Sequence, residues 1–318
     1  MEQKLNYMLN TKNRTSTLGA LIQLLRPNHW SKNSILLIPL FFSGSLSISS
    51  TTDINSILET LIGIVCFSLI ASSIYIINDY KDIESDRNHP TKKTRPLASG
   101  SVSRTSAILL CLLCSSCGIS LAYLIEVKFL FILCLYFVLN LGYSLGLKNI
   151  SILDIIIVSI GFVFRVKAGG AITNIYVSEW LTIMIFLLSL IMAIAKRRDD
   201  VLIKMNSGKD MRVASKAYNI EFLNLCLILI SGVTIVAYLM YTISDDVINR
   251  LGTHRLYYTC LFVIAGIFRY LQIAFVENKT ESPTDILYKD KFIQASILLW
   301  ICSFYFIIYY PQIYSIVL

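Results

Sequence analysis

Nine runs of apolar residues, each about 20 residues long, are spaced along this 318-residue chain. A helix of about 20 residues crosses the hydrocarbon core of a bilayer, and hydropathy of this kind is the main sequence signal for membrane-spanning helices. The sequence therefore predicts an all-α integral membrane protein with nine transmembrane helices. The runs lie at about residues 33–49, 55–77, 105–125, 127–147, 150–172, 178–195, 221–243, 256–276 and 292–313.

The composition excludes several other classes of protein. Hydrophobic residues make up 55% of the chain, and charged residues make up only 15%, against about 25% in a soluble domain. The eight cysteines lie in apolar runs, where we expect small buried hydrophobic side chains rather than disulfides. Cys111, Cys114 and Cys117 have a spacing that resembles a metal site, but no histidine or acid lies beside them.

The cations are distributed unevenly between the two sides of the membrane. The chain has 28 Lys and Arg against 20 Asp and Glu, a net charge of +8. With a cytoplasmic N-terminus, 22 of the cations lie inside, and only Lys128, Arg250 and Arg255 lie outside. This positive-inside distribution predicts a multi-pass protein of the cell (inner or plasma) membrane with its C-terminus outside. Many of these cations need no role beyond topology and contact with anionic lipid headgroups, and we expect no nucleic-acid partner.

Two regions are expected along the chain. Residues 1–32 are polar and basic, without a cleavable signal pattern, and are predicted to be a cytoplasmic N-terminal segment. Residues 33–318 show no linker and are predicted to form one membrane domain. The oligomeric state is left open, although an oligomer is compatible with the sequence, and the loop 244–255 has no motif that we can interpret.

The strongest chemical pattern is a row of oxygen ligands after the second apolar run, within Asn78-Asp79-Tyr80-Lys81-Asp82-Ile83-Glu84-Ser85-Asp86. On a helix, Asn78, Asp82 and Asp86 share one face, and Tyr75 extends it. Carboxylates one turn apart suit Mg²⁺, which also takes phosphate oxygens of a substrate. We therefore predict a magnesium–diphosphate site with Asn78, Asp82 and Asp86 as ligands and with Asp79, Asp82 and Asp86 as the catalytic acids. The alternative is a solvated acidic loop, which fits poorly directly after a membrane span.

Basic residues flank this row on both sides and are candidate phosphate ligands. The loop His89–Gly100 contains three cations, Lys92, Lys93 and Arg95, between two prolines and could cover a bound phosphate. Lys32 and Asn33 precede the first apolar run, where a helix N-terminus also favours anions. The alternatives are an ordinary cytoplasmic loop and an interfacial anchor around Trp30.

Further candidates lie at the ends of later runs and inside one of them. Tyr143 and Lys148 end the fourth run, and Arg165 lies within the fifth, where a buried arginine faces a cavity or a partner by default. The sixth run ends in three adjacent cations and two acids, which would hold a lipid phosphate or simply end the span. These residues are Lys196, Arg197, Arg198, Asp199 and Asp200.

The nine runs and the Asn78–Asp86 pattern resemble the UbiA superfamily of intramembrane prenyltransferases. This resemblance covers essentially the whole chain and implies a ring of nine helices around a lipid-open cavity, capped by polar loops. Ordinary members have a second aspartate-rich motif that holds a second Mg²⁺ at the end of the sixth span. Here the segment 196–200 replaces it, which resembles the branch that transfers phosphoribose to polyprenyl phosphate. The segments 26–33, 143–148, 153–169 and Arg269-Tyr270 resemble the same branch.

The resemblance implies a Mg²⁺-dependent transfer of 5-phosphoribose from phosphoribosyl diphosphate to a decaprenyl-like phosphate, with release of pyrophosphate. Because donor and acceptor together contribute three anionic groups, the reaction requires many cations around the site. The alternative within the family is transfer of a prenyl group to an aromatic or other small acceptor. A nine-span transporter of an anionic metabolite is an alternative from another class, but a transporter needs no metal–diphosphate site.

Overall fold

The computed structural model describes residues 17–42, 51–88, 92–207, 217–277, 286 and 289–317. Within these ranges the chain is helical, with no β-strand. Eight helices are long and apolar enough to cross a membrane, which confirms an all-α integral membrane fold. They are α4 (Thr51–Lys81), α6 (Arg104–Ile125), α7 (Val127–Leu145), α8 (Leu153–Thr173), α9 (Glu179–Ser207), α10 (Ile220–Thr242), η5 to η6 (Leu256–Glu277, which includes α12, Cys260–Gln272) and α14 (Lys291–Val317).

The first expected span, 33–49, is only partly within the described residues. A 3₁₀ helix, η1 (Pro27–Leu37), runs directly into α3 (Ile38–Phe42), and residues 43–50 lie outside the described part. The expected boundary between the N-terminal segment and the membrane domain, at residue 32, falls inside η1. The count of nine spans therefore stays a prediction.

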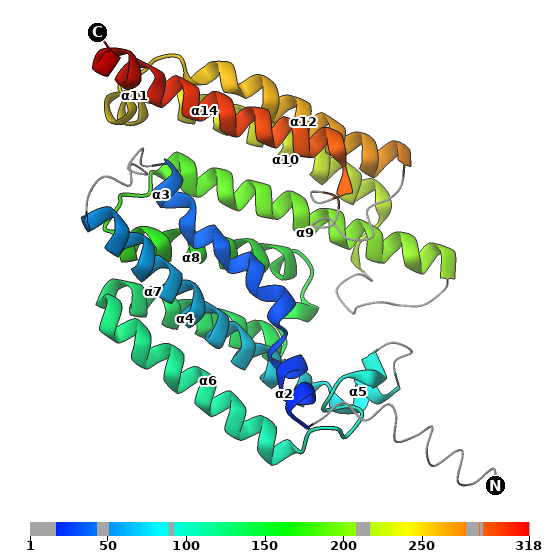
Figure 1. Cartoon of the computed structure of the whole chain (residues 1–318). Helices are drawn as coiled ribbons and strands as arrows, with labels where there is room; N and C mark the ends of the chain where they lie inside the picture. Colours follow the sequence, from blue (N-terminus) through cyan, green and yellow to red (C-terminus); the bar gives the residue numbers. More distant parts are fainter. Residues whose placement is uncertain are drawn as a thin grey trace, which may run out of the picture.

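The helices form a bundle in which α9 lies between two groups (Figure 1). On one side, α8, α4, α7 and α6 pack together, and on the other side lie α10, α12 and α14. Shorter elements complete the described fold: α2 (Thr17–Leu25), α5 (Ile83–Arg87), η2 (Lys92–Thr94), η3 (Leu147–Asn149) and α11 (Asp245–Leu251). We call the end of the bundle at which α4, α7 and α9 finish the site end.

Burial separates the helices that form the core of the bundle from those at its edge. The spanning parts of α4, α8 and α9 are the most buried, whereas α6 is the least buried. Large apolar side chains of α6 such as Leu109, Leu112 and Leu124 are more than half exposed. In a bilayer these faces contact lipid chains, so exposure costs nothing there. The polar residues that build the site consequently lie on the central helices.

A glycine on α8 brings η1 against that helix. A Cβ atom on Gly169 would lie 2.0 Å from the carbonyl oxygen of Leu36, a backbone atom that a side-chain rotation cannot remove. Hydrogen bonds also attach η1 to α4: Asn33 Nδ2 donates to Ser68 Oγ at 2.9 Å, and Trp30 Nε1 donates to Ser72 Oγ at 3.1 Å. The position of Lys32 at the site end therefore depends on this close helix packing.

Replacing Gly169 with alanine is expected to destabilise the protein by about 1–3 kcal/mol, since the added methyl group forces η1 away from α8. The matched control is Gly232→Ala in α10, where a Cβ atom meets nothing within 4 Å. Thermal unfolding in detergent measures both variants. Equal melting temperatures for the two variants would contradict the close approach at Gly169.

An apolar cavity of about 590 Å³ lies between η1–α3, α9, α10, α12 and α14. Ser34 and Met192 line it near the site end, and Phe42 and Trp300 line it near the opposite end. Nearly all of the lining atoms are apolar. The cavity therefore suits a hydrocarbon chain that lies roughly along the helices.

Candidate active site

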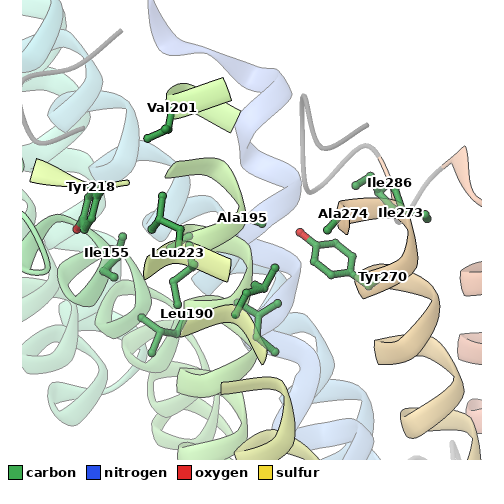
Figure 2. Close-up of a cluster of buried hydrophobic side chains, with 14 of the residues drawn as sticks. Ile155, Leu190, Ala195, Val201, Tyr218, Leu223, Tyr270, Ile273, Ala274 and Ile286 are labelled. Atoms are coloured by element: carbon green, nitrogen blue, oxygen red, sulfur yellow. The ribbon is translucent and has the colours of Figure 1, made fainter. Parts of the chain in front are cut away.

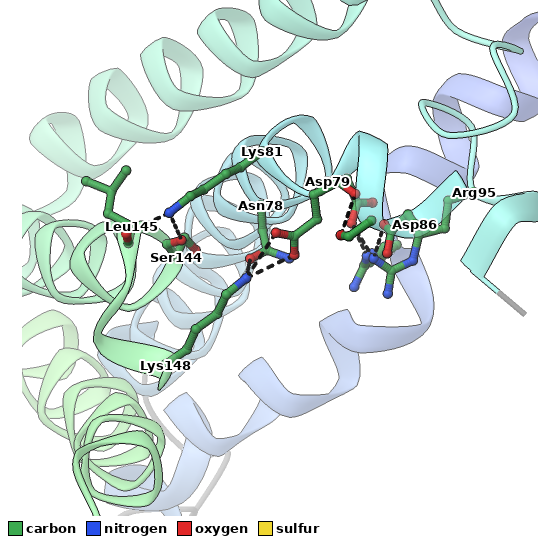
Figure 3. Close-up of polar contacts among 11 residues, drawn as sticks. Asn78, Asp79, Lys81, Asp86, Arg95, Ser144, Leu145 and Lys148 are labelled. Atoms are coloured by element: carbon green, nitrogen blue, oxygen red, sulfur yellow. Dashed lines mark hydrogen bonds and ion pairs between the residues drawn. The ribbon is translucent and has the colours of Figure 1, made fainter. Parts of the chain in front are cut away.

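The acids of the Asn78–Asp86 row lie where α4 ends. The helix stops at Lys81, and a turn at Asp82 leads into α5. Asn78 Nδ2 donates to Asp82 Oδ2 at 3.3 Å, and Lys148 Nζ donates to Asn78 Oδ1 at 3.0 Å and to Asp82 Oδ2 at 2.9 Å (Figure 3). The side chains of Asp82 and Lys148 are 27% and 22% exposed. Asn78, Asp82 and Lys148 thus form one partly accessible group.

Asp79 and Asp86 form a second group with two arginines. Arg95 Nη1 donates to Asp79 Oδ1 at 2.9 Å and to Asp86 Oδ2 at 2.8 Å (Figure 3). Arg26 Nη2 also donates to Asp79 Oδ1, at 2.5 Å. Both carboxylates are buried. Each is paired with an arginine, so this group ties the N-terminal segment and the 92–95 turn to the end of α4.

The structure thus divides the predicted row of Asn78, Asp82 and Asp86 into two groups. It brings Asn78 and Asp82 together, whereas Asp86 lies with Asp79 around Arg95. The division follows the break in the helix after Lys81. Among the described residues, no three His, Cys, Asp or Glu side chains are close enough to hold a metal ion by themselves.

The donor set nevertheless fits Mg²⁺ in one respect. Asn78 and Asp82 offer oxygen ligands at a partly exposed position, and Mg²⁺ is usually bound by one or two carboxylates together with water and substrate phosphate oxygens. The amine of Lys148 now contacts the same oxygens, so it would have to move when an ion binds. Asn78 and Asp82 are the residues that would hold the metal.

A row of cationic and aromatic side chains connects the acids to the cavity. The guanidinium of Arg26 lies 4.9 Å from the ring centre of Tyr75, and the rings of Tyr75 and His29 are 5.5 Å apart. Burial, together with Lys32, Arg26 and Lys196, lowers the pKa of His29 to about 4. His29 is therefore neutral at physiological pH.

Lys32 follows His29 in this row and lies close to other cations. Burial, with Lys196 and Arg165, lowers the pKa of Lys32 to about 8. The ammonium group thus lies in a positive field that favours an anion. Ser34, two residues further along η1, lines the apolar cavity. The positive end of the row is therefore two residues along η1 from the lining of that cavity.

The value of kcat/KM for an anionic substrate is expected to fall by up to about tenfold between pH 7 and pH 9. Below pH 8 Lys32 is mostly charged, and above it the side chain loses the proton and with it the attraction for the anion. The matched variant is Lys32→Arg, whose guanidinium does not titrate in this range. An equally steep decline in Lys32→Arg would contradict the assignment.

Arg165 is buried in the middle of α8 with each side of its guanidinium occupied. Nε donates to Asn33 Oδ1, Nη1 to the carbonyl of Gly161 and Nη2 to Tyr136 Oη, each at 2.8 Å. Phe67, Tyr136 and Phe162 surround it at 4.8–5.6 Å. Asn33 is buried in the same network. The structure thus places these two predicted phosphate ligands in contact with other protein groups.

The three cations at the end of α9 point to different surroundings. Lys196 is exposed and lies within electrostatic range of Lys32, whereas Arg197 and Arg198 are buried. Arg197 forms ion pairs with Asp154 and Asp200, and Arg198 Nε donates to Asn224 at 2.8 Å. Of the other predicted ligands, Lys92 and Lys93 lie on η2 and Tyr143 lies on α7, each at least partly exposed.

Sequence reasoning singled out neither Arg26 nor Tyr218 as a site residue. Arg26 pairs with Asp79, and Tyr218 donates to Asp154 Oδ1 at 2.7 Å. Arg26 lies in the segment before the first apolar run, and only its positive charge could have indicated a role near the acids. Tyr218 follows a polar loop with no recognisable pattern, so no signal could have found it.

Comparisons with known proteins identify relatives of this chain. The model of the UbiA prenyltransferase family matches residues 36–292. The decaprenyl-phosphate phosphoribosyltransferase of Mycolicibacterium smegmatis is 32% identical over 89% of this chain and 91% of its own length. The enzyme of the same name from Corynebacterium glutamicum is 29% identical over 88% and 84%.

A solved structure shows the same fold. The UbiA homologue of Archaeoglobus fulgidus bound to DMAPP and Mg²⁺ has a TM-score of 0.66 and 19% sequence identity, over 91% of this chain and 98% of that one. Since the family model covers most of the chain and the bundle has the same architecture, this protein belongs to the UbiA prenyltransferase family.

Proposed function

We propose that this protein transfers 5-phosphoribose from phosphoribosyl diphosphate to a polyprenyl phosphate and releases pyrophosphate. The supporting observation is a group of neighbouring positive charges between the acids and an apolar cavity. Arg26 pairs with Asp79, and Lys32 lies within electrostatic range of Lys196 and Arg165. Ser34, two residues from Lys32, lines the cavity. Two phosphorylated substrates that meet beside these charges need cations on both sides. The mycobacterial and corynebacterial relatives carry the name of this reaction.

The donor is proposed to bind beside Asn78 and Asp82. Asn78 and Asp82 would hold Mg²⁺ there, and its charge would offset the negative charge that develops on the leaving diphosphate. Lys148, released from the carboxylate, lies within reach of the same phosphates, and Lys92, Lys93 and Arg95 lie on the neighbouring turn. These cations hold the donor through charge-assisted hydrogen bonds.

The acceptor is proposed to lie along the apolar cavity with its phosphate beside Lys32 and Lys196. The cavity is lined by apolar atoms, and Ser34 in its lining lies two residues from Lys32, which supports an isoprenoid chain in the cavity with its phosphate near Lys32. His29 is neutral at physiological pH, so Lys32 and Lys196 supply the positive charge on this side of the site. Arg165 contributes a buried positive charge behind Lys32.

The bonds change at the anomeric carbon of the ribose. The bond from this carbon to the diphosphate oxygen breaks, and the pyrophosphate takes both electrons. An oxygen of the lipid phosphate forms the new bond to the carbon. The acceptor is already ionised at neutral pH, so the step needs no strong base. The protein acts by bringing two anions together in the correct geometry and by stabilising the charge that moves to the leaving group.

We further propose that the site end faces the cytoplasm of a cell membrane. The predominance of cations in the loops at that end favours this orientation. Phosphoribosyl diphosphate is a water-soluble metabolite, and a cytoplasmic site gives it direct access. The N-terminus would then be cytoplasmic and the C-terminus outside.

Prenyl transfer to a small acceptor is the second candidate, favoured by the Archaeoglobus structure with DMAPP and Mg²⁺. Release of pyrophosphate distinguishes the two. Purified protein in lipid receives Mg²⁺ and polyprenyl phosphate, with either phosphoribosyl diphosphate or a prenyl diphosphate plus an aromatic acceptor. Release only with phosphoribosyl diphosphate is expected. Release only with the prenyl diphosphate would contradict the proposal, and release with neither would favour transport.

A further inference from the structure

A cluster of buried charges lies between the start of α8 and the end of α9. Arg197 Nε lies 2.6 Å from Asp154 Oδ2, and Arg197 Nη1 donates to Asp200 Oδ2 at 2.5 Å. The side chains of Arg197 and Asp154 are 3% and 0% exposed. Two carboxylates this close together in a water-poor place repel each other unless a cation lies between them. In this protein that cation is a guanidinium.

Tyr218 connects this cluster to the loop before α8. Its hydroxyl donates to Asp154 Oδ1 at 2.7 Å and accepts the N–H of Ile152 at 2.5 Å. Tyr218 also packs among Ile155 and Leu223 (Figure 2). We call Asp154, Arg197, Asp200 and Tyr218 the Arg197 cluster.

The loop held by the Arg197 cluster contains Lys148. Ile152, at the end of this loop, has a φ of +71°, a conformation that a β-branched residue rarely adopts. Strained backbone of this kind persists only where surrounding contacts fix it, and here the contact is the hydroxyl of Tyr218. Lys148 reaches Asp82 from the same loop. The Arg197 cluster therefore fixes the direction from which Lys148 approaches the acids of α4.

The Arg197 cluster and the Lys148–Asp82 pair differ in accessibility. Lys148 is a single ammonium group on a flexible stem, and both of its partners are partly exposed, so an ion from solution can take its place. Arg197 is a rigid guanidinium enclosed by its acids. Breaking a buried ion pair leaves an uncompensated charge, which is strongly unfavourable. A divalent ion can therefore exchange with Lys148 but not with Arg197.

The carboxylates at the end of α9 already have arginine partners. Arg197 pairs with Asp154 and Asp200, and Asp199 lies within electrostatic range of Arg198. A divalent ion would have to displace these buried guanidinium groups to reach the carboxylates. The second Mg²⁺ that the family resemblance implies at this place does not fit these residues.

We propose that Arg197 is a positioning residue that takes the place of a second metal ion, so that the protein binds one divalent ion per chain, at Asn78 and Asp82. Arg197 then acts through Asp154 and Tyr218 on the Lys148 loop rather than as a ligand of a substrate phosphate. The proposal shares with the proposed function only the metal site at Asn78 and Asp82. It holds whether the enzyme transfers phosphoribose or a prenyl group.

Counting bound ions tests the number of metal sites. The purified full chain is dialysed to equilibrium against Mn²⁺ with pyrophosphate, which supplies the phosphate oxygens that complete the site, and the Mn²⁺ bound per chain is measured. One ion per chain is expected, and Asp82→Asn is expected to bind none. Two ions per chain, or one ion retained in Asp82→Asn, would overturn the proposal. Neither result depends on which donor the enzyme uses, so failure here is distinct from failure of the proposed function.

Pyrophosphate binding tests the positioning role. Tyr218→Phe removes only the hydroxyl that holds Ile152 and Asp154, and it is expected to raise the Kd of pyrophosphate with Mg²⁺ about tenfold. The control is Tyr241→Phe, a buried tyrosine of α10 outside the site and outside the cavity lining. Pyrophosphate leaves in both candidate reactions. A Kd unchanged in Tyr218→Phe, with only the melting temperature lowered, would overturn the role assigned to the cluster.

Discussion

Replacing Asp82 with asparagine is expected to lower the rate of pyrophosphate release by about 100-fold or more. Asp82 lies in the turn directly after α4, beside Asn78, and its side chain is partly exposed. The substitution keeps the shape of the side chain but removes the negative charge that would attract a divalent ion. It also removes the ion pair with Lys148, so the loss of charge weakens both metal binding and the attachment of the loop that contains Lys148.

Glu84→Gln is the matched control for this prediction. Glu84 lies two residues further along, its side chain is 76% exposed, and its ion pairs within the described part of the chain are with the exposed Arg87 and Arg104. Exposed ion pairs of this kind contribute little to stability. The activity of Glu84→Gln is expected to stay near that of the unmodified protein. Equal rates for Asp82→Asn and the unmodified protein, with unchanged Mg²⁺ dependence, would refute the assignment of Asp82.

Asp154→Asn is expected to cause the largest loss of stability, about 3 kcal/mol or more. Asp154 is completely buried between Arg197 and the hydroxyl of Tyr218. The amide leaves the guanidinium with one carboxylate instead of two, inside a region that excludes water. α8 and α9 are joined at the site end through this residue, so unfolding should begin there.

Thermal unfolding in detergent measures this effect. Asp246→Asn, an exposed acid of α11, is the control and is expected to change the melting temperature very little. Melting temperatures lowered equally in the two variants would contradict a buried ion pair. The Arg197→Lys variant is expected to be destabilised as well, since a single ammonium group cannot contact both acids as the planar guanidinium does.

The membrane fold could be predicted from the sequence because an apolar run of about 20 residues in a bilayer forms a helix, which satisfies all of its backbone hydrogen bonds internally. Eight of the nine expected runs are helices long enough to cross the bilayer. The first run differs, because its described part is the end of a 3₁₀ helix that continues into a short α-helix. Local hydropathy does not determine which helix type forms.

The membership of the site could be predicted in part. A helical period placed Asn78 and Asp82 together, as the structure does. The same period placed Asp86 with them, but the turn at Asp82 directs Asp86 toward Arg95. The roles of these residues as metal ligands stay predictions, to be tested by the measurement of bound Mn²⁺.

The sequence by itself determined the membrane class, the position of the carboxylate row and the excess of cations near it, because hydropathy and local charge are properties of short segments. Only the tertiary structure decided which cations meet which acids. Arg26 reaches Asp79 across 53 residues, Lys148 reaches Asp82 across 66, and Arg165 reaches Asn33 across 132. A buried charge is stable only where a partner lies within a few ångströms, and that partner is chosen by helix packing and not by sequence distance.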